Sequence, residues 1–571
     1  MARALATAIL GLALTGIGPA EARKDELGPL GQVPGPTHCG VSGGNAATAA
    51  ASTPPLFNGL GTRSFVITTA NPEAQAYFDQ GLRWAYAFNH AEARRAFVEA
   101  QRRDSGCALC AWGEALVLGP NINKPMDPAD NSAALAALHR AEGLAGQASA
   151  KEQALIQAAK LRYSADHSAE RAALDAAYGE AMSQVAQRFP EDSDIQVLAA
   201  EALMDTQPWD YWQDDRRSPK GRHGETLALL ERVLATEPDH PGAIHLYIHA
   251  VEASDDPQRA LAPARRLAAL MPTAGHIVHM PSHIYYRVGL WKESLEANRQ
   301  AVRADEAYFA TAGAAPGIYR DGYYPHNIHF LLVTAQMSGD GATAIAAADK
   351  LAATITEEGA RAIAWAQPIK AAPYFTHAQF SPPETVLGLP DPGDGLPYVK
   401  ALWHYARGTA LAQQGSIPDV EGEIAAIRRL AEQPAIARLG AEGVPAPDVL
   451  ALAVEVLRGR AAQSTGQLDR AAAHFREAIA VEDKLTYTEP PWWYYPVRQS
   501  LGATLMMAGD PAGAEAVFRE ALAKVPNNGW ALWGLAQAQR AQGNHKAAAE
   551  SEATFQRVWV SAISTPQLAG L

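Results

Sequence analysis

The chain has 571 residues, of which 48% are hydrophobic and 19% are charged. This length exceeds what one compact core usually spans, so several domains or an extended repeat array are expected. The formal net charge of −13 argues against nucleic acid as a partner, because nucleic acid binds basic surfaces. No internal run reaches the roughly 18 apolar residues of a membrane span, so no transmembrane segment is expected after the N-terminal region.

The N-terminal segment, from Met1 to Ala22, predicts a secretory signal peptide. A short basic start at Arg3 is followed by an apolar stretch from Ala4 to Gly18, and Ala20-Glu21-Ala22 fits a small-x-small cleavage site. We therefore expect a periplasmic or secreted protein.

Residues 23–71 are rich in Gly, Pro and Ala, which is typical of a flexible leader. The chain contains three cysteines, Cys39, Cys107 and Cys110. In an oxidising compartment an odd number leaves one cysteine unpaired or all three free. Because no His follows the CxxC spacing, a c-type haem site is not expected; the pair is interpreted as helical, with an optional disulfide and only a weak indication of metal binding.

From about Pro72 the pattern is helical almost to the end, in short amphipathic segments that pair. Small and aromatic residues recur at fixed offsets, as in Gly81 with Phe97, and Gly502 with Phe518. These segments resemble the tetratricopeptide repeat (TPR) family, whose unit is a 34-residue helix-turn-helix. The resemblance implies an all-α fold, a TPR-like right-handed superhelix of stacked antiparallel helix pairs. We expect N-terminal TPR-like helices at 72–240, His-rich units at 241–358 and C-terminal units at 359–571.

Histidines repeat with the period of the units. His245 and His249 recur exactly one unit later as His279 and His283, and the pair His276 and His279 recurs further along the chain, with the same i, i+3 spacing, as His326 and His329. When the three His-rich units are aligned, these histidines occupy positions two, five and nine of the first helix of each unit. Side chains at these three positions lie on one face of the helix. By resemblance, this face lines the concave groove. A kink is expected at Pro281, which lies inside one of these helices.

Seven imidazoles on one face predict a metal site, with a polar ligand-binding groove or structural network as the alternative. Neutral imidazole suits copper, zinc or iron rather than magnesium or calcium. Two sets of three histidines on adjacent helices favour a dinuclear copper site, and a three-histidine zinc site is the main competitor. The predicted metal ligands are His245, His249, His276, His279, His283, His326 and His329.

Neighbouring residues suggest supporting roles. We expect Glu252 or Tyr286 to support the ligands or transfer protons, and Arg287 to orient an anionic group. Four aromatic residues at loop-to-helix joins are candidates for a substrate pocket, although packing between repeat turns is the simpler interpretation: Trp209, Trp212, Trp493 and Tyr494. An insertion from about Tyr308 to Tyr324 could cover the groove.

Two functions from different classes follow. The first is a copper-dependent oxidoreductase acting on a small aromatic or phenolic compound, with a zinc-dependent hydrolase as a variant. The second is a non-catalytic TPR module that binds a peptide, a partner protein or a metal ion in its groove. The segments 274–289 and 322–331 also resemble those of a group of secreted bacterial TPR proteins, which leaves the reaction open.

Overall fold

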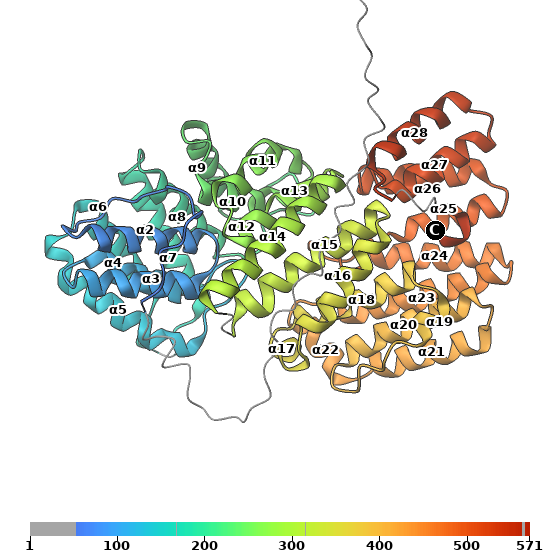
Figure 1. The fold of residues 1–571 in the computed structure, drawn as a ribbon, viewed down its shortest axis with the longest axis horizontal. Helices are drawn as coiled ribbons and strands as arrows, with labels where there is room; N and C mark the ends of the chain where they lie inside the picture. Colours follow the sequence, from blue (N-terminus) through green and yellow to red (C-terminus); the bar gives the residue numbers. More distant parts are fainter. Residues whose placement is uncertain (1–52, 167, 314–315, 562–565) are drawn as a thin grey trace, which may run out of the picture. The chain divides into compact units, whose positions relative to one another are not determined.

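A computed structural model describes residues 53–166, 168–313, 316–561 and 566–571. The predicted signal peptide and Cys39 lie outside them. The chain separates into two units, Met1–Ser42 and Gly43–Leu571, and every residue described belongs to the second. Helices dominate the described residues, whose only β contacts are two isolated bridges, Asn121–Lys124 and Trp212–Pro219. Successive helices pack against one another as antiparallel pairs (Figure 1), so the predicted all-α, TPR-like solenoid is confirmed.

Most of the helices follow one another through short turns, and longer connections lie between α4 and α5, between α8 and α9 and between α24 and α25. The N-terminal part contains α2 (Pro72–Tyr86), α3 (His90–Arg103), α4 (Ala108–Leu118), α5 (Asn131–Leu144), α6 (Ala150–Ala159), α7 (Arg171–Arg188), α8 (Ser193–Met204) and α9 (His223–Thr236). The central part contains α10 (Pro241–Glu252), α11 (Leu261–Leu270), α12 (Gly275–His279), α13 (Pro281–Arg287), α14 (Trp291–Ala312), the π-helical turn η5 (Tyr319–Tyr323), α15 (Tyr324–Ser338) and α16 (Gly341–Thr354).

The C-terminal part contains α17 (Glu357–Ala362), α18 (Ala366–Phe380), α19 (Pro383–Leu387), α20 (Pro397–Gln413), α21 (Ile417–Ala431), α22 (Pro434–Ala441), α23 (Ala446–Ser464), α24 (Leu468–Glu482), α25 (Val497–Met507), α26 (Pro511–Lys524), α27 (Gly529–Ala541) and α28 (His545–Val558). Single 3₁₀ turns lie at Pro128–Asp130, Ala145–Gln147, Lys160–Arg162, Pro257–Ala260 and Leu568–Gly570. None of the helices described here is both long and apolar enough to cross a membrane.

The same packing arrangement, a phenylalanine ring between two glycines of neighbouring helices, occurs near both ends of the array. The ring of Phe518 on α26 lies against two glycines, Gly502 on α25 and Gly534 on α27, where an added Cβ would come within 2.7 Å and 2.3 Å of the ring. Phe97 on α3 packs in the same way against Gly81 and Gly113. Glycine lets three consecutive helices approach closely, and one aromatic ring fills the space between them.

The leader predicted as flexible over 23–71 is ordered where the structure describes it. Residues 53–71, here called the N-terminal strap, run along the first helices with Phe65 buried. Arg63 donates hydrogen bonds to the carboxylate of Asp194 on α8, far along the chain. Composition alone missed these contacts, because a few large residues in a Gly- and Pro-rich segment are enough to anchor it.

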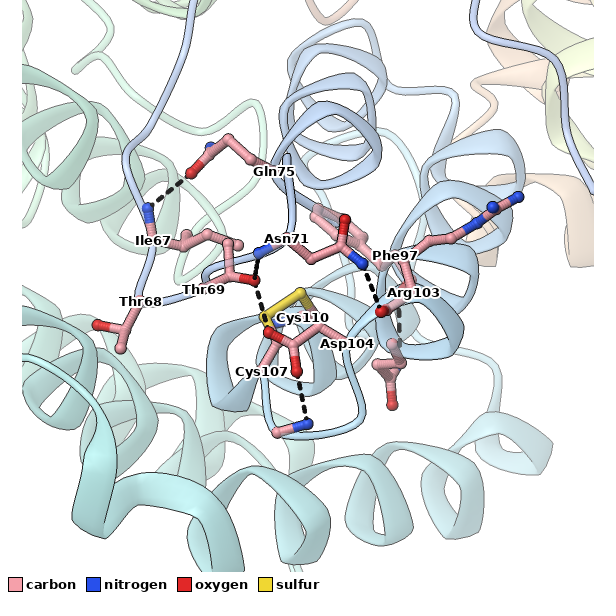
Figure 2. Close-up of a disulfide and its surroundings, with 12 residues drawn as sticks. Ile67, Thr68, Thr69, Asn71, Gln75, Phe97, Arg103, Asp104, Cys107 and Cys110 are labelled. Atoms are coloured by element: carbon pink, nitrogen blue, oxygen red, sulfur yellow. Dashed lines mark hydrogen bonds between the residues drawn. A yellow bond between two sulfur atoms is a disulfide. The ribbon is translucent and has the colours of Figure 1, made fainter. Parts of the chain in front are cut away.

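The optional disulfide is present between Cys107 and Cys110, at the start of α4 (Figure 2). The Cys107 sulfur also accepts a hydrogen bond from the backbone N–H of Cys110 at 3.1 Å, so this residue caps the helix. Beside it, the side chain of Asn71 donates to the carbonyl of Arg103 at 2.7 Å. The bond therefore stabilises the turn that joins α3 to α4, next to the end of the N-terminal strap.

The last helices contact the central part of the chain. The indole N–H of Trp530 on α27 donates to the carbonyl of Gln336 on α15 at 2.9 Å. The backbone N–H of Val560 donates to the carbonyl of Ser338, the last residue of α15, at 3.0 Å. These bonds connect repeat units that are far apart in the sequence.

Candidate metal centre and its cavity

The seven predicted histidines lie on four helices of the central part. His245 and His249 belong to α10, His276 and His279 to α12, His283 to α13, and His326 and His329 to α15. The predicted break at Pro281 is present, since α12 ends at His279 and α13 begins at Pro281. A proline in the first turn of a helix loses no intrahelical hydrogen bond, so the interruption lets two short helices present their imidazoles independently.

Three of these histidines form a first group, in which one nitrogen of each ring lies within 4.8 Å of the others: His245, His249 and His276. The Nε2 atoms of His245 and His276 are 3.2 Å apart. His245 Nδ1 donates to the carbonyl of Tyr86 at 2.7 Å, and His249 Nδ1 donates to Glu252 at 2.8 Å. The Nε2 atom of His249 has no hydrogen-bond partner among the described residues.

A second group follows the same plan and consists of His279, His283 and His326. The Nε2 atoms of His279 and His283 are 2.9 Å apart. His279 Nδ1 donates to the side-chain oxygen of Asn298 at 2.7 Å, and the amide of Asn298 is oriented by its own bond to the carbonyl of Ser294. His283 Nδ1 donates to Glu252 at 2.6 Å. The two groups are adjacent, with the rings of His249 and His283 centred 5.6 Å apart.

Glu252 joins the two groups. Its Oε1 accepts from His249 in the first and its Oε2 from His283 in the second. Burial raises the pKa of a carboxyl, yet His283 and His249 bring the pKa of Glu252 below its usual range. Glu252 is therefore a carboxylate that fixes the orientation and tautomer of one imidazole on each side. The predicted supporting role of this residue agrees with its position.

This hydrogen-bonding pattern fits a metal. Four rings give their Nδ1 proton to an acceptor, so their Nε2 atoms carry lone pairs. Burial lowers the pKa of His245, His276, His279 and His326 well below the usual value, which keeps these imidazoles neutral. The lone pairs of His279 and His283 face each other at 2.9 Å, and they repel unless a cation lies between them. Two nitrogens bound at about 2.0–2.1 Å to one tetrahedral metal would be separated by roughly 3.3 Å, close to the distances between Nε2 atoms in the two groups.

His329 lies outside both groups, contrary to the prediction that it is a ligand. It is buried, and its ring packs edge-on against Tyr494 with the centroids 5.1 Å apart. Neither ring nitrogen has a hydrogen-bond partner among the described residues. The repeated i, i+3 spacing correctly placed His329 on the same helix as His326, but one turn along α15 takes its ring away from the second group.

A cavity of about 980 Å³ opens onto both groups. His249 and His276 of the first group and His283 and His326 of the second line its wall, together with His329. Aromatic and proline side chains form much of the remainder. Residues of the predicted insertion contribute Tyr323, whose ring centroid is 4.7 Å from that of His276.

The structure brings three of the four predicted pocket aromatics to this cavity, namely Trp209, Trp212 and Tyr494. Trp493 is wrong as a pocket residue: it is buried against Phe375 and Tyr405, and the neighbouring Trp492 lines the cavity instead. In a run of consecutive aromatics, composition cannot tell which side chain faces inward.

Tyr286 and Arg287 do not line the cavity. Tyr286 packs against Trp291 and Phe330, and burial raises its pKa. Arg287 donates to the carbonyls of Glu252 and Ser254 at 2.8 and 2.9 Å. The proton-transfer role predicted for Tyr286 does not agree with its position outside the cavity, whereas Nε of Arg287 lies 3.7 Å from the cavity-lining carboxylate of Glu489. Arg287 also holds the carboxyl end of α10, where Glu252 lies.

Glu489 lines the cavity and was missed from the sequence. Its Oε2 lies 3.5 Å from Nδ1 of His283, and its Oε1 lies 3.7 Å from Nε of Arg287, so both oxygens lie within ion-pair distance of a basic group. Burial and the nearby charge of Glu252 raise its pKa well above the usual value. Its only sequence signal was its place directly before the Pro490–Pro496 aromatic cluster.

Comparisons with known proteins bear on the scaffold only. A tetratricopeptide repeat family model matches residues 505–551, which include α26 and α27. Solved structures with similarity include the human IFIT1 dimer with m7Gppp-AAAA (13% identity, 80% of this chain and 90% of that chain, TM-score 0.32), yeast Tom70 (12%, 86% and 92%, 0.26) and the P58(IPK) TPR domain (14%, 66% and 95%, 0.20). At these TM-scores the likenesses carry no argument. No curated protein matches the chain.

Proposed function

We propose that this TPR-like protein binds two metal ions, one in each histidine group, and acts as a copper-dependent oxidoreductase on a small aromatic or phenolic compound. One observation carries the proposal: six imidazoles converge in two adjacent groups, and acceptors hold the Nδ1 protons of four of them, so that the Nε2 lone pairs face inward. Neutral imidazole is a ligand that copper and zinc prefer.

Bound copper would supply one-electron and dioxygen chemistry. The protein contributes the surroundings. Trp209 and Tyr494 form apolar walls that select a flat ring and exclude water. Glu489 and His329 are buried polar groups at the same cavity, and both are placed to hydrogen-bond a ligand hydroxyl. The signal-like N-terminus suggests a periplasmic or secreted location, where the Cys107–Cys110 disulfide would persist.

Two alternatives use the same features differently. A single group of three histidines would also hold zinc with an open position, which supports a hydrolase. The repeat match at 505–551 supports a binding module without turnover, for a peptide, a partner protein or a small ligand. Absence of nucleic acid as a partner stays an expectation from the acidic composition.

Metal analysis of protein secreted with its native N-terminus tests the proposal. We expect two copper ions per chain. His276→Ala and His326→Ala should each leave one, because each removes one ligand from a different group and neither ring donates Nδ1 to a protein acceptor in the described structure. His474→Ala, which removes a histidine bonded to Glu455 elsewhere, should retain two.

Other outcomes discriminate between the alternatives. Stoichiometric zinc in the purified protein would favour the zinc-dependent hydrolase over the copper-dependent oxidoreductase. Protein that binds no metal at micromolar copper or zinc would overturn the metal centre and leave the binding module.

A further inference from the structure

Backbone strain gathers at the cavity. Four described non-glycine residues have a positive φ, namely Phe88, Trp209, Arg216 and Asn527. Trp209 and Arg216 line the cavity, and Phe88 packs on His245 with the ring centroids 4.4 Å apart. A bulky side chain in this conformation is strained, and such residues cluster where a site requires them.

Trp209 and Arg216 belong to one structured loop between α8 and α9, here called the 208–220 loop. Its arms are joined by the bridge between Trp212 and Pro219. The indole N–H of Trp212 donates to the carbonyl of Ala250 on α10 at 2.9 Å, which attaches the loop beside the first histidine group. The loop therefore presents its side chains from a defined position.

Trp209 supplies an aromatic surface beside the metal ligands. Its ring meets that of His249 edge-on, with the centroids 5.2 Å apart. It is one of the few large apolar side chains that remain exposed, at 37%. A strained, exposed indole next to a buried imidazole is placed to pack against the ring of a ligand.

Arg216 supplies a positive charge at the same cavity. No carboxylate lies within ion-pair distance of it among the described residues, and its guanidinium instead lies 5.7 Å from the ring centre of Tyr487. Arg287 lies over the same ring at 5.4 Å, so two cations lie against one aromatic side chain. Burial and the charge of Arg287 lower the pKa of Arg216, as expected where no anion balances the charge.

We infer that the cavity binds an aromatic carboxylate, with its ring against Trp209 and its carboxylate at Arg216. This inference rests on the proposed function, since it names the substrate class of the same site. An arginine fork matches a carboxylate geometrically, and a charge-assisted pair is stronger than a neutral hydrogen bond. The ring then extends from Trp209 toward the histidine groups.

Equilibrium binding tests this inference without relying on turnover. The probes are 3-(4-hydroxyphenyl)propanoate and 4-ethylphenol, which share a phenol ring and differ in the carboxylate. Titration calorimetry on the metal-free and copper-loaded protein should show the acid binding at least about tenfold more tightly than the neutral phenol. In Arg216→Gln this preference should fall to within about twofold.

Arg217→Gln is the matched control. Arg217 is the next residue in the loop, but it is exposed and paired with Asp255, and it does not line the cavity. The preference for the acid should persist in this variant. Trp209→Gly should weaken both probes about equally, since it removes the ring surface and leaves the cation in place.

Equal binding of the two probes to the unaltered protein, or an unchanged preference in Arg216→Gln, would overturn the inference. Loss of the preference in Arg217→Gln as well would also count against it. Failure of the metal centre is distinguishable, because the metal content is measured separately and the preference is tested on the metal-free protein too.

Discussion

Nδ1 of His283 donates to Oε2 of Glu252 at 2.6 Å, from α13 to the last residue of α10. The second carboxylate oxygen holds His249 in the other histidine group. A single buried carboxylate thus determines the tautomer of one ligand on each side, and the two groups depend on one another through it.

Removal of the charge at this position should weaken both sites together. For Glu252→Gln we expect a loss of roughly 10–100-fold in metal affinity, because an amide is a poorer acceptor and offers only one oxygen. Competition with a chromophoric chelator measures the affinity. Glu455→Gln removes the carboxylate of a His–Glu pair outside the cavity and should leave it unchanged. A loss at only one of the two sites would contradict the shared role.

Chelation should lower thermal stability. Metal that binds only the folded state stabilises it by RT ln(1 + [L]/Kd), or about 2.7 kcal/mol at a free concentration one hundred times Kd. We expect the melting temperature to fall on addition of EDTA and to recover with copper. In His326→Ala the fall should be smaller, because one site is lost. An unchanged melting temperature in the presence of saturating copper would argue against binding to the folded protein.

Asp305 should make stability depend on pH near neutrality. Tyr319 and Asn327 donate to its two oxygens, and burial raises its pKa to about 7. The folded state then binds a proton that the unfolded state releases above pH 4, so the contribution of Asp305 to stability falls as pH rises from about 4 to 7 and is constant above. Asp305→Asn should remove this slope, which is on the order of 1 kcal/mol per pH unit.

Urea denaturation of metal-free protein at pH 5, 6, 7 and 8 measures the slope. Asp469→Asn, at an exposed helix start, is the control and should keep it. A parallel pH dependence in the wild type and Asp305→Asn would show that other groups carry it.

A methyl group added at a glycine that packs against Phe518 should lower the stability of the fold. An Ala Cβ at position 502 would lie 2.7 Å from the ring, so Gly502→Ala should destabilise by about 1–3 kcal/mol. Gly422→Ala in α21 places a Cβ where nothing lies within 4 Å, and should instead stabilise by about 0.5–1 kcal/mol. Helical circular dichroism in urea follows both. Equal changes in the free energy of unfolding for the two variants would mean that helix propensity, and not contact with the Phe518 ring, determines the effect.

Periodicity in the sequence predicted the helix pairs and the convergence of six imidazoles, since both repeat along the chain. It could not predict the acceptors behind them. The carbonyl of Tyr86 and the side chain of Asn298 carry no periodic signal, and they reach His245 and His279 through tertiary packing. Glu489 lies far beyond α15 in the sequence, and it meets the site only because the segment between α24 and α25 contacts the central helices at Glu252 and His283. The same holds for the choice between Trp492 and Trp493.

The hydrogen bonds from Trp530 and Val560 to α15 distinguish this chain from an open repeat array, because they join units that are not neighbours in the sequence. In an open array each unit contacts only its neighbours, so terminal units can be trimmed or can fray without disturbing the middle. Here the helix that carries His326 is braced by the far end of the chain. Deleting the final hairpin would therefore remove contacts from the helix that carries a histidine of the second group, and not only from its neighbouring unit.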